Sequence, residues 1–195
     1  GAWVTPYLMH PNNNNTLIVG KSQVYETTNG GTSWNPLGTI NGTGMIKSMA
    51  YAASNPQFIY VATDSEFFTN NGVNNWQSPS GSSILDKITY ISVDPNNDQR
   101  VFITTSGYTA GNKVWESNNG GNTWINISGT LPNVPANCIV YENGSNDGLY
   151  VGTDLGVYYK NATMSDWIPF ATNLPNVIVN ELEISYLNNK IWAGT

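Results

Sequence analysis

The chain has 195 residues, a formal net charge of −6 and only 10% charged residues, against 39% hydrophobic and 12% aromatic residues. A disordered chain combines low hydrophobicity with high charge, so this composition predicts a folded domain or part of a repeat array. With 7 Lys and Arg residues the chain offers no basic stripe for nucleic acid or an anionic membrane, and no apolar run approaches the ~18 residues of a membrane span.

Short β-rich runs recur along the chain, and each follows an apolar strand and a Pro- or Asn-containing turn. These runs are residues 16–20, 58–62, 100–104, 148–152 and 190–194. Asn makes up about 15% of the chain, and together with 19 Gly and 10 Pro it indicates many tight turns. We therefore expect an all-β chain.

Tryptophans follow the first four runs at intervals of roughly 42–48 residues, which is the length of a four-stranded propeller blade. The octets 27–34 and 117–124 match each other, 69–76 is a degraded copy and 161–167 a more eroded one. The residues expected to build structural turns at these places are Thr27, Asn29, Gly31, Trp34, Asn71, Trp76, Ser117, Asn119, Gly121, Trp124 and Trp167.

The repeat predicts an all-β propeller of four-stranded antiparallel blades, because a single such sheet cannot bury both of its faces alone. The blades are expected at 3–46, 47–87, 88–136 and 137–180, with two strands of a fifth in 181–195. An open end leaves a blade face and strand edges bare, so we expect part of a larger propeller with about seven or eight blades. A five-bladed ring completed by other residues is the alternative.

The octets resemble the Asp-box, or BNR, repeat, whose pattern is Ser/Thr-x-Asp-x-Gly-x-Thr-Trp/Phe. Asn29, Asn71 and Asn119 stand at the position of the Asp. In that family the carboxylate bonds the backbone N–H groups of the turn, and Asn keeps an acceptor oxygen for this purpose. The resemblance implies a folding device at the outer edge of the blade, with no catalytic role of its own.

Segments 1–7, 106–113 and 150–159 look most like secreted, multidomain propeller proteins of Bacteroidetes-type bacteria, described as glycosyl-hydrolase-like or sortilin-like. This resemblance implies a secreted or cell-surface protein with its signal peptide outside this chain. It also implies that the partners include further blades or other domains of the same polypeptide.

The first functional hypothesis is a non-catalytic scaffold that binds a polysaccharide or a protein through its loops. Aromatic faces and amide groups suit sugars, and both are plentiful here. The loop from Ser106 to Asn112 is an insertion relative to the other blades and carries Tyr108. Tyr108, Asn112, Asp64 and Asp154 form the predicted binding set, and packing of Tyr108 on a neighbouring loop is the alternative for that residue.

The second hypothesis is half of an inverting glycoside hydrolase. Thr153-Asp154-Leu155-Gly156 resembles the Thr-Asp-x-Gly signature that carries the general base in xyloglucanases of the Asp-box class, so Asp154 is the one catalytic candidate. Asp64 occupies the same blade position, which favours a turn-capping carboxylate in both blades. A partner carboxylate would have to lie outside this chain.

Several other sites are not expected. Sialidase activity needs a cluster of arginines for the substrate carboxylate, and this chain offers Arg100 alone. The oxygen-rich run 94–98 falls at an ordinary turn between the first two strands of its blade, so no metal or cofactor is expected. Cys138 lies in an apolar run and is expected to be a buried, inert thiol.

Overall fold

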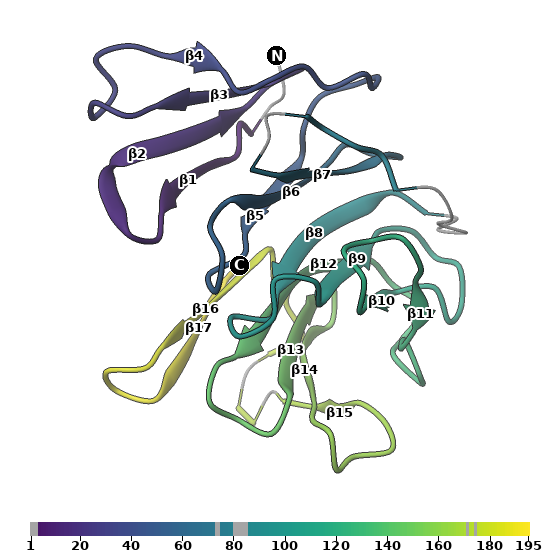
Figure 1. Ribbon diagram of the computed structural model, residues 1–195. Coiled ribbons are helices and arrows are strands. Elements are labelled where there is room, and N and C mark those ends of the chain that lie inside the picture. Colours follow the sequence, from purple (N-terminus) through teal and green to yellow (C-terminus); the bar gives the residue numbers. More distant parts are fainter. Residues whose placement is uncertain (1–3, 73–74, 80–85, 171, 174) are drawn as a thin grey trace.

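The structure is a computed structural model that describes residues 4–72, 75–79, 86–170, 172–173 and 175–195 (Figure 1). Residues 1–3 of the N-terminal resemblance lie outside the described part. All regular structure in these ranges is β-strand, as the composition predicts. Accordingly, the described residues include no helix able to span a membrane.

Five antiparallel sheets follow one another along the chain, and we call them blades 1 to 5. Blade 1 contains β1 (Tyr7–His10), β2 (Asn13–Gly20), β3 (Val24–Thr27) and β4 (Asn35–Pro36). Blade 2 contains β5 (Ser48–Tyr51), β6 (Phe58–Ala62) and β7 (Phe67–Asn71), and an isolated bridge from Thr69 to Gln77 stands at the place of a fourth strand.

Blade 3 contains β8 (Ile88–Val93), β9 (Val101–Thr105), β10 (Val114–Ser117) and β11 (Ile125–Asn126). Blade 4 contains β12 (Ala136–Glu142), β13 (Gly148–Thr153), β14 (Gly156–Lys160) and β15 (Ile168–Pro169). Blade 5 is the hairpin of β16 (Glu181–Ser185) and β17 (Lys190–Gly194). The range expected for the fourth blade, 137–180, begins one residue after the start of β12 at Ala136.

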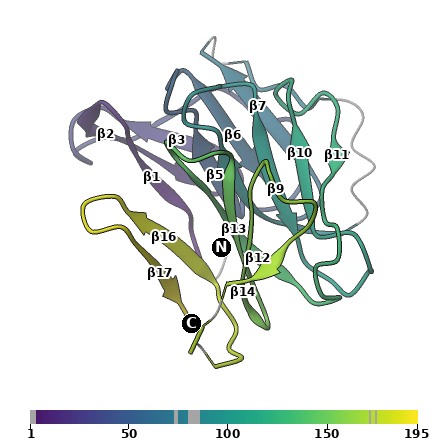
Figure 2. The same cartoon turned by 90° about the horizontal axis from the view of Figure 1, so that it is seen from below.

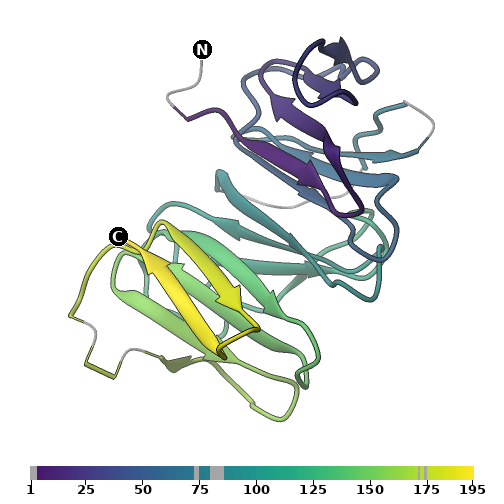
Figure 3. The ribbon, with the colours of Figure 1, turned by 90° about the vertical axis from the view of Figure 1, so that its left-hand side faces the viewer.

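The blades are arranged radially. The first strand of each blade contacts the first strand of the next, in the order β1, β5, β8, β12 and β16 (Figure 2). Each following strand lies further out in its sheet. Blade 1 and blade 5 lie at opposite ends of the row (Figure 3). This arrangement confirms a propeller fold of antiparallel blades.

The turns gather at two ends of the blades. First-to-second and third-to-fourth turns meet at one end, which we call the hairpin face, where Gly30 N–H donates to Asn15 O and Gly120 N–H donates to Gln99 O. Second-to-third turns and the connectors between blades meet at the other, which we call the connector face. There Asp154 N–H donates to Pro135 O.

The tryptophans join each blade to the preceding one. Trp76 of blade 2 donates from Nε1 to Leu37 O of blade 1, and Trp167 of blade 4 donates to Ile127 O of blade 3 at 2.8 Å. Trp124 of blade 3 packs edge-on against Phe67 of blade 2, with ring centroids 5.2 Å apart.

Blade 1 differs from blades 2 and 4 in the burial of its tryptophan, because Trp34 is 42% exposed whereas Trp76 and Trp167 are buried.

The core consists of apolar clusters between neighbouring blades, which is how each sheet buries both faces. Cys138 is fully buried in the cluster between blades 4 and 5. Burial, assisted by the nearby charge of Glu181, raises the pKa of this thiol to about 12. The thiol therefore stays protonated at neutral pH, in agreement with an inert role.

Candidate functional site

The third-to-fourth turn of blade 1 is closed by a network of side chains. Thr27 Oγ1 accepts a hydrogen bond from Gly31 N–H at 2.9 Å and donates to Asn29 Oδ1 at 2.9 Å. Asn29 Oδ1 also accepts from Ser33 N–H at 3.0 Å, while its Nδ2 donates to Ser33 Oγ. Gly31 has φ +94°, a conformation that glycine adopts without strain.

Blade 3 repeats this geometry. Ser117 Oγ accepts from Gly121 N–H at 2.8 Å and donates to Asn119 Oδ1 at 3.0 Å. Asn119 Oδ1 accepts from Thr123 N–H, and its Nδ2 donates to Thr123 Oγ1 at 2.9 Å. The amide keeps the turn closed and adds a donor that a carboxylate lacks. Both Asn side chains are occupied within the turn.

Blade 2 departs from the expected register. Asn70 occupies the sheet position that Thr27 and Ser117 hold in their blades, and it is buried. Its Oδ1 accepts from Gly72 N–H at 3.0 Å. Asn71, which the octet alignment places at the key turn position, is instead the exposed last residue of β7. Blade 2 has one residue fewer between this sheet position and its tryptophan. An alignment that starts from Trp76 therefore assigns the key turn position to a residue one place too far along the chain.

The second-to-third turns hold the two predicted aspartates on the connector face. Thr63 Oγ1 accepts from Glu66 N–H at 3.1 Å, and Thr153 Oγ1 accepts from Leu155 N–H at 3.0 Å. The expectation of a turn-capping carboxylate is therefore wrong, because the preceding threonine closes each turn. This leaves Asp64 and Asp154 available for other contacts.

Asp64 and Asp154 have different surroundings. Asp64 is exposed and lies 3.7 Å from Lys87 Nζ in an ion pair on the surface. Asp154 is partly buried, and its Oδ1 accepts from Asn137 Nδ2 at 2.9 Å. Asn137 Nδ2 also donates to Val179 O in the connector to blade 5. Asp154 is thus positioned at the junction of two blades.

The loop from Ser106 to Lys113 presents Tyr108, whose side chain is 69% exposed. Asn112, predicted as a binding residue, is buried beneath it. Its Nδ2 donates to Asp86 Oδ2 at 2.9 Å, and its Oδ1 accepts from Trp115 Nε1 at 2.8 Å. Asn112 therefore holds the loop, and Tyr108 is the residue of this pair that faces solvent.

A buried lysine also fixes this loop, which the sequence did not indicate. Lys113 is almost completely buried, and its Nζ donates to Gly107 O at 2.8 Å. Burial lowers the pKa of Lys113, and the charge of Asp86 works in the opposite direction. Gly107, with φ +99°, approaches Asp86 so closely that a Cβ would lie 3.0 Å from its carboxylate. Tyr108 therefore lies on a rigid support.

A groove of about 490 Å³ lies along the first strands, at the centre of the propeller. Its lining is mainly apolar and includes Met9, Met49 and Val140 from three different blades. Glu183 adds a carboxyl group, whose pKa is raised by burial and by the neighbouring Glu181. Sequence reasoning missed this groove because its walls come from strands that are far apart in the chain.

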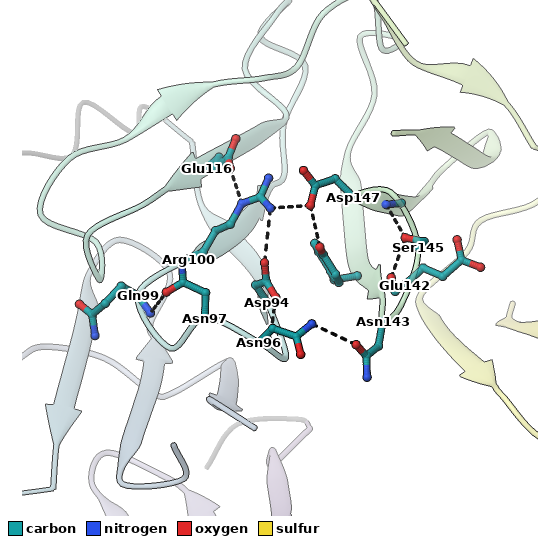
Figure 4. Close-up of polar contacts among 12 residues, drawn as sticks. Asp94, Asn96, Asn97, Gln99, Arg100, Glu116, Glu142, Asn143, Ser145 and Asp147 are labelled. Atoms are coloured by element: carbon teal, nitrogen blue, oxygen red, sulfur yellow. Dashed lines mark hydrogen bonds and ion pairs between the residues drawn. The ribbon is translucent and has the colours of Figure 1, made fainter. Parts of the chain in front are cut away.

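The junction of blades 3 and 4 contains a charged cluster on the hairpin face (Figure 4). Arg100 donates from Nε to Glu116 Oε1 at 2.7 Å and from Nη1 to Asp147 Oδ1 at 2.7 Å. Its Nη1 also lies 3.4 Å from Asp94 Oδ2. Tyr141 OH donates to the same Asp147 oxygen at 2.7 Å. Arg100 and Asp147 thus bridge the two blades.

The aromatic rings of Phe102 and Tyr141 complete this cluster. The guanidinium carbon of Arg100 lies 5.1 Å from the ring centroid of Phe102 and 5.8 Å from that of Tyr141. Burial opposes the charge of Arg100, but its hydrogen bonds to Asp147 and Glu116 outweigh this and raise its pKa. The hydrogen bonds from Arg100 and Tyr141 lower the pKa of Asp147. Arg100 and Asp147 are therefore both ionised at neutral pH.

Comparison with protein-family models and with curated proteins gives no match. Solved structures with the same fold include an ancestral GH74 enzyme, with a TM-score of 0.70 and 20% identity over 85% of this chain and 24% of that one. The extracellular domain of BT4673 from B. thetaiotaomicron has a TM-score of 0.71 and 15% identity, over 100% of this chain and 26% of that one.

A third is the GH74 xyloglucanase from Xanthomonas campestris, with a TM-score of 0.71 and 10% identity over 94% of this chain and 33% of that one. At these identities the likeness shows the β-propeller fold. The chain spans about a quarter of the first two of these structures and a third of the xyloglucanase.

Proposed function

We propose that this chain is a non-catalytic propeller module of a secreted or cell-surface bacterial protein, and that it binds a polysaccharide through its connector face. The observation that carries this proposal is the exposed ring of Tyr108 on a loop fixed by Lys113 and Asn112. A rigid aromatic platform binds a sugar ring at little cost in conformational entropy.

The composition of the surface supports a neutral ligand of this kind. Charged residues make up only 10% of the chain, so amide and hydroxyl groups provide most of its polar surface. These groups both donate and accept hydrogen bonds, as sugar hydroxyls require. A protein ligand on the same face is the alternative occupant.

We also propose that the repeat is of the Asp-box class and that a further blade covers blade 1. The outer side of blade 1 has an apolar hollow of about 750 Å³, lined by Tyr7, Val19, Tyr25 and Trp34 among others. At the junctions among blades 1 to 4, the Trp of the later blade packs on the blade before it. We expect Trp34 to pack in the same way on a blade that precedes blade 1 in the propeller. The complete propeller would then have more than the five blades described here.

A glycan array tests the binding proposal, with the intact chain as probe. We expect Tyr108→Ala to abolish binding to a polysaccharide that the unchanged protein captures, and Tyr108→Phe to retain most of it. Ile125→Ala is the matched control, because Ile125 is 58% exposed on a different element. Equal loss of binding in Tyr108→Ala and Ile125→Ala would refute a specific role for the loop.

The second candidate function is half of a glycoside hydrolase, supported by the partly buried Asp154 and its hydrogen bond from Asn137. In an inverting mechanism Asp154 would activate water, and a second carboxylic acid would protonate the leaving group. Assay of xyloglucan hydrolysis by the complete protein separates the two functions. Activity that disappears in Asp154→Asn favours the hydrolase, and activity that survives this change removes Asp154 from the reaction.

A further inference from the structure

The junction between blades 1 and 2 uses the same strands of each blade as the charged junction between blades 3 and 4. The sheet registers of the two pairs of blades define the equivalent residues. Around the Arg100 cluster the paired positions give Glu26 for Glu116, Tyr51 for Tyr141 and Ile18 for Phe102. Counting on by one residue from paired positions adds Thr16 for Arg100, Gln57 for Asp147 and His10 for Asp94, and the pairing of β1 with β2 is irregular between Met9 and His10.

The two junctions differ in the guanidinium and in two of the three carboxylates that contact it, since His10 and Gln57 stand at the positions of Asp94 and Asp147. Thr16, a short and buried side chain, stands where Arg100 reaches from blade 3 towards blade 4. Between blades 1 and 2 there is instead a cavity of about 240 Å³, lined among others by His10, Glu26, Tyr51 and Gln57. Gln57 is exposed, so the cavity opens to solvent on the hairpin face.

The groups around this cavity suit a planar cation with several donors. The Glu26 carboxylate corresponds to the Glu116 carboxylate, which accepts from Arg100 Nε at 2.7 Å. The Tyr51 ring corresponds to the ring beside the Arg100 guanidinium. Tyr51 Oη is buried and has no hydrogen-bond partner among the described residues. A buried hydroxyl without a partner is costly, so a bound group that supplies one would be favoured.

The rest of the lining includes the apolar residues Leu37, Pro56 and Ile59, and its polar residues add no positive charge when His10 is neutral. His10 Nδ1 accepts a hydrogen bond from Asn12 N–H at 3.1 Å, which leaves the ring proton of the neutral form on Nε2. The ring of His10 packs edge-on against Tyr51, with centroids 5.4 Å apart. Gln57 also lines the cavity, and its side-chain amide has an oxygen that can accept a hydrogen bond.

We propose that the cavity between blades 1 and 2 binds a guanidinium group supplied by a ligand, at the place that Arg100 fills in the junction between blades 3 and 4. Glu26 pairs with the cation and the ring of Tyr51 packs against its plane. A guanidinium fits better than an ammonium, because its fork of donors matches a carboxylate and its flat face packs on an aromatic ring. This site is independent of the polysaccharide proposed for the connector face.

Titration of the intact chain with N-acetyl-arginine methylamide, followed by NMR chemical shifts, tests this site. We expect shifts at Glu26, Tyr51 and Gly72, which line the cavity. The citrulline and lysine counterparts of the probe should give much weaker shifts, since the first is neutral and the second lacks the planar fork. Equal shifts from the citrulline probe, or shifts spread over other acidic residues, would overturn the proposal.

Two substitutions make the test specific. Glu26→Gln should weaken binding about tenfold or more, because a charge-assisted hydrogen bond is lost. Glu183→Gln is the matched control in the central groove and should leave binding unchanged. Thr16→Arg places the missing guanidinium on the chain and should abolish binding of the probe. Unchanged affinity in Glu26→Gln contradicts the site, whether or not Thr16→Arg folds.

The source of the guanidinium is distinguished by two further probes. Methylguanidinium that binds as tightly as the tripeptide Gly-Arg-Gly indicates a free small cation as the natural ligand. Tighter binding of the tripeptide indicates an arginine side chain of a peptide or protein. If neither binds, the proposal is wrong.

Discussion

The substitution Arg100→Met isolates the contribution of the charged junction between blades 3 and 4. Methionine retains an apolar stem that packs against Phe102 and Tyr141, and it removes the guanidinium. The change leaves the carboxylates of Glu116 and Asp147 without the cation that each contacts at 2.7 Å. The perturbation is thus mainly electrostatic and acts between two blades.

The expected loss of folding free energy follows from how exposed Arg100 and its three carboxylate partners are. The side chain of Arg100 is 19% exposed, and those of Asp94, Glu116 and Asp147 are 9%, 16% and 37% exposed. Removing one partner of a buried pair costs ~3–5 kcal/mol, whereas an exposed pair contributes ~0–1 kcal/mol. Since this cluster is partly accessible, we expect a loss of ~3 kcal/mol. For a chain of this size that corresponds to a fall in Tm of ~6–12 °C.

Thermal and urea unfolding measure this loss, with Lys87→Met as the control. Lys87 and Asp64 form an ion pair whose side chains are 70% and 50% exposed, so the control should cost less than ~1 kcal/mol. A double-mutant cycle of Arg100→Met with Glu116→Gln should give a coupling of ~1–3 kcal/mol. If Arg100→Met lowers the Tm no more than Lys87→Met, the cluster does not hold the blades together.

Two further predictions concern backbone strain and pH. Gly121→Ala should destabilise the chain by ~2–4 kcal/mol, because Gly121 has φ +93° and the new Cβ would lie 2.5 Å from Phe67. Gly31→Ala should cost only ~1 kcal/mol, because Gly31 has a similar φ of +94° but no atom within 4 Å of the new Cβ. Equal Tm values for the two variants would contradict this prediction. Because Arg100 lowers the pKa of Asp147 in the folded state, the cluster's contribution should be complete above the ordinary pKa of Asp and lost as pH falls through the lowered value. Urea unfolding between about pH 2 and 7 should show a steeper acid loss in the unchanged protein than in Arg100→Met.

The spacing of tryptophans and turns was sufficient to predict the class of fold. A blade of four short strands needs a turn about every ten residues, and these turns are visible as Asn, Gly and Pro in the sequence. The geometry of the turns at Thr27 and Ser117 also follows from local sequence, because the side-chain hydrogen bonds that close them join residues 4 positions apart.

Local alignment failed where a turn changed its length. In blade 2 the alignment from Trp76 assigned the key position to Asn71, but the sheet register gives the buried position to Asn70. Register is set by which side chains face the core, and a shift of one residue reverses the faces of a strand. The count of residues from Trp76 could not reveal this.

The sequence by itself determined the repeat, the strand-rich class and the outer turns of this protein, because each depends on residues that are close in the chain. Only the tertiary structure decided which polar residues share a site. Arg100 and Asp147 are separated by 47 positions, and their pairing depends on how the blades pack. The cavity beside Glu26 and Tyr51 also depends on the tertiary structure, because radial packing of blades 1 and 2 brings these side chains together.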